Sequence, residues 1–274
     1  MSENLFAKFD GLEVKASDRI PEEDVLYCEN QQRLYDQAVG FLQDCLQKTR
    51  DIYNAYQDGE YKKDGYIDQY DDIRHFEDRI EKVKQAFSSR IKYYFTNKYK
   101  ITVGNITDRE ALCYSDIVEE IFEQLGGLSF QEKAAKEVMD NLKESCRRGY
   151  SDEVKAVVKN KKVNINDFIW ATKCSIMHRW EIGHNSRDTL VKLFKALSHF
   201  ESGSITIAHY YERFLKLVQN YEDSVFDRYE LGYNKVEAIR VYKNGKTEVE
   251  FSTSEQAQKF AKDYCGFLEK GMVA

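Results

Sequence analysis

Proline is almost missing from this chain of 274 residues, in which Pro21 is the single one. Proteins contain about 5% proline on average. Because proline interrupts helices, its scarcity allows long uninterrupted helices and excludes motifs that need a proline after position 21. Glycine is also scarce, at 14 residues, which excludes a glycine-rich fibrous protein. The hydrophobic fraction of 42% is enough for a folded core, so wholesale disorder is excluded.

Features of secreted and membrane proteins are missing as well. The first eight residues contain no basic start followed by an apolar stretch, and no apolar run approaches about 18 residues. We therefore expect a cytoplasmic protein with no membrane contact. No two cysteines form a C-x-x-C pair, which favours free thiols over disulfides, the alternative. The six cysteines are Cys28, Cys45, Cys113, Cys146, Cys174 and Cys265.

The charge is acidic overall, at −6, and unevenly distributed. Residues 1–80 carry 19 acidic and 10 basic side chains, whereas residues 81–200 carry 16 acidic and 21 basic ones. Dedicated nucleic-acid binders are usually basic, so the balance disfavours direct nucleic-acid binding. The acidic section fits either a basic groove on a partner or a solvated helical surface. An accessory module that binds nucleic acid through the basic middle remains the alternative, with Lys98, Lys100, Arg147, Arg148, Lys155, Lys159, Lys161 and Lys162 as its candidates.

The first hundred residues predict an N-terminal arm over 1–20 and a long αα-hairpin over 21–100. Pro21 followed by three acidic residues is typical of a helix start. Apolar residues recur at steps of three and four up to Tyr56 and again from Ile67 to Lys98, which predicts two amphipathic helices. The apolar residues assigned to the first helix are Val25, Leu26, Leu34, Ala38, Phe41, Leu42, Cys45, Leu46 and Ile52.

Residues 101–274 predict a helical α+β domain, so the fold class is mainly α (α+β). Thr107 opens a capping box that predicts a helix start. Residues 151–169 predict a short helix followed by a strand or loop, and 170–182 a half-buried helix. Residues 236–251 alternate on both sides of an Asn-Gly pair, which predicts a β-hairpin. Ser252 then caps a terminal helix through Leu268.

Known catalytic and cofactor motifs are not found, so we expect no catalytic residue and no cofactor. Gly245-Lys246-Thr247 resembles the end of a P-loop, but Arg240 stands where the motif needs its first glycine. The sequence also contains neither Gly-x-Gly-x-x-Gly nor Gly-x-Ser-x-Gly. A metal-dependent enzyme or nuclease of unrecognised type remains an alternative to a protein without enzymatic activity.

One set of residues has a spacing that suits a metal ion. Cys174, His178 and His184 form C-x3-H-x5-H, and the first two would share one helical face. A fourth ligand would have to come from elsewhere, such as Cys146. The competing interpretation is a packed helix whose histidines form hydrogen bonds, and we favour it over a metal site.

Tyrosine is abundant, at 19 residues, and several tyrosines gather with acidic residues around the loop of the expected hairpin. Tyrosine is enriched at interfaces because it buries a large area and keeps a polar tip. The alternative is tyrosine on half-buried helix faces beside solvated acids. The predicted partner-binding residues are Tyr53, Tyr56, Tyr61, Tyr66, Tyr70, Asp58, Asp64 and Asp68.

Residues 241–251, VYKNGKTEVEF, resemble the closing signature of an uncharacterised domain carried by phages and plasmids. That signature is an aromatic residue, Lys-Asn-Gly, three residues, an apolar residue, any residue and Phe. Glu248 stands where a histidine is common. The domain is often fused to, or encoded near, DNA adenine methyltransferases, whose Pro-Pro catalytic motif this chain cannot contain. The matching residues are Tyr242, Lys243, Asn244, Gly245, Val249 and Phe251.

The resemblance implies an origin in a mobile element without the methyltransferase activity. Together with the missing catalytic motifs, it predicts a non-enzymatic phage or plasmid protein that acts in the cytoplasm of a bacterial host cell. We expect it to bind and inhibit a host defence protein complex, such as a CRISPR effector or an anti-phage nuclease. Long amphipathic helices are also compatible with a homo-oligomer.

Overall fold

The structure, a computed structural model, describes residues 19–57, 67–107, 113–147, 149, 153–175 and 178–267. Helices and a small antiparallel sheet occur together, which confirms the mixed α+β class. The chain divides into two compact units, Met1–Phe130 and Gln131–Ala274. This division falls later than the boundary expected at residue 100, because α3 packs against α1 and α2 and thus joins the first unit.

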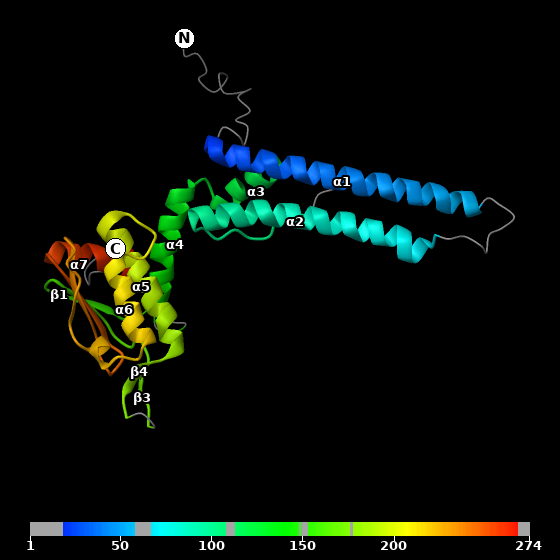
Figure 1. Cartoon of the computed structure of the whole chain (residues 1–274). Coiled ribbons are helices and arrows are strands. Elements are labelled where there is room, and N and C mark those ends of the chain that lie inside the picture. The colour runs from blue at the N-terminus through cyan, green and yellow to red at the C-terminus, as the bar shows by residue number, and fades with distance from the viewer. Residues whose placement is uncertain are drawn as a thin grey trace, which may run out of the picture. The chain divides into compact units, whose positions relative to one another are not determined.

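The first unit is built around two long helices that run antiparallel, side by side (Figure 1). A third, shorter helix lies near the start of the first and the end of the second (Figure 1). Its described elements are α1 (Glu22–Gln57), the π-helical turn η3 (Gln69–Ile73), α2 (Arg74–Tyr99) and α3 (Tyr114–Leu125).

The contact between α1 and α2 follows from helical periodicity. Buried residues of α1 recur at steps of seven and four, and those of α2 at steps of four, so each set forms one face. Tyr35 stacks on Phe87 with ring centroids 4.5 Å apart, and Tyr27 stacks on Tyr94 at 3.8 Å. The buried residues are Cys28, Tyr35, Val39 and Leu46 on α1 and Phe87, Ile91 and Phe95 on α2.

The helix start expected at Thr107 is wrong, because α3 begins at Tyr114 after Cys113. Thr107 is instead held by α3 itself. Its backbone N–H and its hydroxyl both donate to Oε1 of Glu120, at 2.7 and 2.8 Å. The capping pattern thus reflects a contact between a loop and a helix.

In its described residues, the second unit combines four helices with a five-stranded antiparallel sheet and a separate two-stranded one. In the large sheet the strand order is β1-β2-β7-β6-β5. The helical elements are α4 (Phe130–Ser145), α5 (His184–Ser202), α6 (His209–Gln219), the 3₁₀ turn η4 (Asp223–Phe226) and α7 (Ser254–Cys265). The strands are β1 (Ala156–Lys159), β2 (Lys162–Ile165), β3 (Ala171–Lys173), β4 (Trp180–Ile182), β5 (Tyr229–Glu230), β6 (Val236–Val241) and β7 (Thr247–Phe251).

The sheet is apolar on one face and charged on the other. Along β7, Val249 and Phe251 are buried and alternate with Glu248 and Glu250, as expected for a sheet that packs on one side. Phe251 contacts Phe200 of α5 and Phe260 of α7, with ring centroids 5.6 and 5.2 Å apart. The apolar face therefore joins the core formed with the helices.

Three parts of the second unit differ from the expectation. The helix expected within 151–169 is the strand pair β1–β2, whose turn contains Asn160 at φ 51°. Asparagine tolerates this left-handed conformation, which a helix cannot continue through. The helix expected over 170–182 is the pair β3–β4, in which Lys173 lies opposite Trp180. The side chain that caps α7 is Thr253 rather than Ser252, and the helix ends at Cys265, before Gly266.

Tyr211 gives a test of the core of the second unit. It is fully buried and stacks on Phe194, but its hydroxyl has no hydrogen-bond partner within the described residues. Burial also raises the pKa of this hydroxyl. Because an unsatisfied buried polar group is costly, Tyr211→Phe should stabilise the protein by about 1 kcal/mol in denaturant unfolding.

Tyr233→Phe is the matched control. Its hydroxyl accepts a hydrogen bond from the Tyr210 backbone N–H at 3.4 Å, so its removal should not stabilise the protein. A loss of stability in Tyr211→Phe would show that the hydroxyl has a partner in solution.

Candidate functional site

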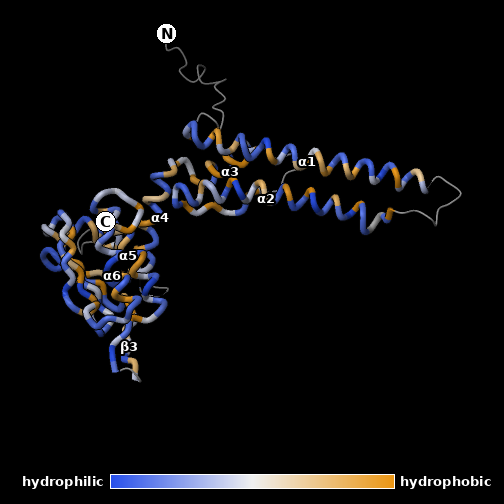
Figure 2. The backbone as a smooth tube through the Cα atoms, viewed as in Figure 1, coloured by the Kyte–Doolittle hydropathy of each residue, from blue (hydrophilic) through white to orange (hydrophobic). Residues whose placement is uncertain are grey.

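Large apolar side chains are exposed mainly on the two long helices. Nine such residues are exposed in the described part of the chain, and five of them lie on α1 and α2. Figure 2 shows that apolar residues recur along the length of both helices. Contiguous exposed apolar surface usually marks an interaction site. The five residues are Leu26, Leu34, Phe41, Ile52 and Tyr93.

Three of the five form a stripe along α1. Leu34, Phe41 and Ile52 are separated by seven and eleven residues, which places them within about 20° around the helix. Periodicity placed them, together with Leu46, among the apolar positions of one amphipathic helix, but Leu34 is 49% exposed and Phe41 is 67% exposed. Buried Tyr35 and Leu46 point about 100–120° away from the stripe, toward α2.

A groove of about 220 Å³ lies beside this stripe, between α1 and α2. Gln32 on the same helix points nearly opposite to Leu34, because residues two positions apart in a helix differ in direction by about 200°. Its Oε1 accepts the Tyr114 backbone N–H at 2.8 Å, so α3 approaches the side of α1 away from the groove. We call the face with the groove the groove face. The groove is lined by Gln31, Leu34, Tyr35, Ala38, Val83, Ala86, Phe87 and Arg90.

The two helices carry opposite charge. α1 contains seven acidic and three basic residues, and α2 contains three acidic and seven basic ones. Some of this charge is satisfied between the helices, as in the ion pair of Arg50 with Glu77 at 2.5 Å. The groove face is thus apolar along its middle, with an acidic helix on one side and a basic helix on the other.

Three of the predicted partner-binding residues have described side chains, and these lie at the end of α1 and just before η3. Tyr53 and Tyr56 are half-buried, and Asp68 is exposed, with its Oδ1 accepting the Asp71 backbone N–H at 3.0 Å. Together with Ile52 we call these residues the distal end of the helix pair. Of the other predicted residues, Tyr61, Tyr66, Asp58 and Asp64 and the side chain of Tyr70 lie outside the described residues.

At the opposite end of the helix pair, a buried carboxylate fixes α1 to α2. Asp24 is fully buried and accepts the Tyr94 hydroxyl at 2.7 Å, the Tyr99 hydroxyl and the Lys98 ammonium. Burial by itself would raise the pKa of Asp24, but the hydrogen bonds from Lys98, Tyr99 and Tyr94 outweigh it and lower that pKa. Lys98 also binds Glu23. This cluster positions the helix pair, and the sequence did not reveal it.

The structure does not bring the candidate metal ligands together. Cys174 and His178 lie between β3 and β4, not on a shared helical face, and the Cys174 N–H donates to the Arg179 carbonyl at 2.8 Å. His184 begins α5, and Cys146 is buried. Among the residues that the structure describes, no three His, Cys, Asp or Glu side chains form a group that could hold a metal ion.

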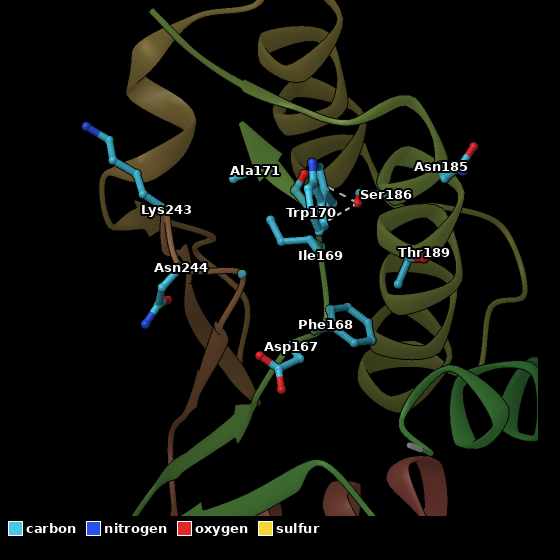
Figure 3. Close-up of a pocket in the computed structure, with 11 residues that line it drawn as sticks. Asp167, Phe168, Ile169, Trp170, Ala171, Asn185, Ser186, Thr189, Lys243 and Asn244 are labelled. Atoms are coloured by element: carbon cyan, nitrogen blue, oxygen red, sulfur yellow. Dashed lines mark hydrogen bonds between the residues drawn. The ribbon is translucent and has the colours of Figure 1, made fainter. Parts of the chain in front are cut away.

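A cavity of about 550 Å³ lies in the second unit, between residues 167–171, the start of α5 and the β6–β7 turn (Figure 3). Trp170 is 73% exposed there, and its backbone N–H donates to Oγ of Ser186 at 2.6 Å. The Gly245 carbonyl accepts the N–H groups of Phe168 and Ile169. The Asn-Gly turn thus has a structural role, since it holds one wall of the cavity.

Three of the eight basic residues that could bind nucleic acid, Lys98, Lys161 and Lys162, are paired with carboxylates. Lys161 lies 2.7 Å from Glu237 and 3.1 Å from Glu250, and Lys162 lies 2.8 Å from Glu248. Burial by itself would raise the pKa values of Glu248 and Glu250, but their hydrogen bonds to basic side chains outweigh burial and lower these pKa values. Lys98 is held by Asp24 in the same way. Phosphate contacts would have to displace these carboxylates.

Comparisons with protein-family models, with curated proteins and with solved structures find no match to this chain. In the described ranges, no helix combines the length and the apolar character needed to span a membrane. The candidate site therefore stands on the geometry of the two long helices.

Proposed function

We propose that this protein is a non-enzymatic phage or plasmid protein that binds and inhibits a host defence protein complex in the bacterial cytoplasm. The target class is a CRISPR effector or an anti-phage nuclease, blocked by protein–protein contact. The resemblance of residues 241–251 to a mobile-element domain supports the origin. The observation that carries the binding role is the concentration of exposed large apolar side chains on α1 and α2.

Within this proposal, the long antiparallel hairpin presents its distal end to the target. Ile52 is exposed there, and Tyr53 and Tyr56 are half-buried on the same final turns of α1. Aromatic residues that bury area and keep a polar tip often dominate the binding energy at interfaces. No cofactor or metal is needed for inhibition by steric or conformational blockade.

The test is a plaque assay in bacterial strains that each carry one defined defence system, in which the protein should protect an infecting phage from that system. Expression of the protein should restore plaque formation in at least one such strain, and the purified protein should bind that system's effector. Changing Ile52, Tyr53 and Tyr56 together to serine should weaken this binding by about a hundredfold, because several anchors are lost at once. Calorimetry with the purified effector gives the dissociation constant.

Tyr93→Ser is the matched control, because Tyr93 is 70% exposed on α2 and lies near the other end of the pair. It should bind the effector like the unchanged protein. Equal affinity of the triple variant and the control would show that the distal end is not the contact surface. Failure to protect phage from any defence system would refute the inhibitor function itself.

A further inference from the structure

The middle of the helix pair carries apolar surface that no described element covers. Leu34 and Phe41 point out from α1 on the groove face, and Val83 and Ala86 line the same groove from α2. α3 approaches the other side of α1, where it is held by Gln32. Two paired helices bury one face each, whereas a four-helix bundle buries a wider apolar surface on every helix. The groove face has the residues that such a bundle would bury.

The charges of the two helices indicate what covers this face. α1 has four more acidic than basic residues, and α2 has four more basic than acidic ones. A partner that matches both must present a basic helix to α1 and an acidic helix to α2. A second copy of this chain presents that pair of helices.

We propose that two copies of this protein associate through their groove faces into an antiparallel four-helix bundle, with α1 of each copy against α2 of the other. Two-fold symmetry allows two ways to place the groove faces together. An axis parallel to the helices sets α1 opposite α2 of the partner copy, so acidic helices meet basic ones. An axis across the helices would set α1 against α1, and like charges would repel. The charge distribution selects the first arrangement.

The register of the helix pair locates Phe41 in this bundle. Tyr35 lies beside Phe87, and Arg50 lies beside Glu77. Because the two helices run antiparallel, residue numbers rise along α1 as they fall along the neighbouring positions of α2. Phe41 therefore lies at the height of Val83 and its neighbours on α2. In the proposed arrangement, Phe41 packs near Val83 of the partner copy.

The test is the molar mass and dissociation constant of the full chain in solution, measured by light scattering and analytical ultracentrifugation over a dilution series. The unchanged protein should have twice the chain mass of 32.2 kDa. Phe41→Glu places an unpaired charge in each half of the interface and should weaken the dimer by about a hundredfold. Circular dichroism confirms that the variant remains folded, which is expected because Phe41 is exposed.

Leu26→Glu is the matched control. Leu26 is also on α1 and is 60% exposed, but it points about 80° away from the stripe of Leu34 and Phe41. It should leave the dimer unchanged. A monomeric unchanged protein would overturn the proposal, as would equal effects of the two substitutions.

Salt distinguishes the two arrangements. Pairing of α1 with α2 of the partner copy should weaken as salt screens unlike charges, whereas pairing of α1 with α1 should strengthen. A dimer that tightens with added salt would therefore overturn the proposed arrangement. These measurements need no target, so their failure leaves the proposed inhibitor function standing, and the phage test leaves the dimer standing.

Discussion

Replacing Gly245 by alanine is expected to destabilise the second unit by about 3 kcal/mol or more, measured by denaturant unfolding. Two costs add at this position. Gly245 has φ +86°, a conformation that residues with a side chain rarely adopt. A Cβ atom there would also lie 2.5 Å from the carbonyl oxygen of Ile169, which is backbone and cannot rotate away.

Neighbouring hydrogen bonds prevent the turn from moving aside. The Gly245 carbonyl accepts the N–H of Phe168 at 2.9 Å and that of Ile169 at 3.1 Å, and the Gly245 N–H donates to the Tyr242 carbonyl at 2.9 Å. A shift that relieves the clash would break these bonds. Their loss would leave buried backbone groups without partners.

Gly203→Ala is the control that measures the cost of positive φ without a steric clash. Gly203 has φ +76° but nothing lies within 4 Å of a Cβ built on it, so its substitution should cost only about 1 kcal/mol. The difference between the losses of unfolding free energy in the two variants gives the cost of the clash between the added Cβ atom and Ile169. Equal unfolding free energies would show that the turn relaxes without losing its contacts.

The same turn shows which parts of the fold the sequence could reveal. The Asn244-Gly245 pair indicates a turn by itself, although of the two only Gly245 has positive φ in the structure. The β1–β2 turn uses Asn160 and the β3–β4 turn contains His178 at φ 51°, and neither is flanked by a comparable signal. Their short strands depend on pairing within the sheet, which no local pattern records.

The candidate site was only partly predictable, for two physical reasons. Periodicity identified Leu34 and Phe41 as apolar helix positions, but burial depends on the neighbouring helix, and that helix covers Tyr35 and Leu46 instead. The tyrosines at the distal end, by contrast, could be placed there from their positions beside the expected hairpin loop. Asp24 was interpreted as a charge at a helix start. Its partners are 70 to 75 residues away, so only the structure brings them together.

Asp24 therefore gives the second large expected effect. Asp24→Asn should lower the unfolding free energy by about 3 kcal/mol at neutral pH, because a buried partner of Lys98 loses its charge. Glu23→Gln is the matched control, since Glu23 also binds Lys98 but has a side chain that is 71% exposed. It should cost less than about 1 kcal/mol. Equal losses of unfolding free energy in the two variants would show that burial does not make the contact of Asp24 with Lys98 more stabilising than that of Glu23.

The pH dependence of these variants tests the cause. The hydrogen bonds from Lys98, Tyr99 and Tyr94 outweigh burial and hold the pKa of Asp24 below its ordinary value of 3.8. A lowered pKa in the folded state stabilises the protein above that ordinary value, and this stabilisation is lost as the pH falls through the folded-state pKa. The stability difference between the unchanged protein and Asp24→Asn should thus be constant near neutrality and shrink in acid. A difference that grows in acid would mean that folding raises the pKa, and that burial rather than hydrogen bonding controls this carboxylate.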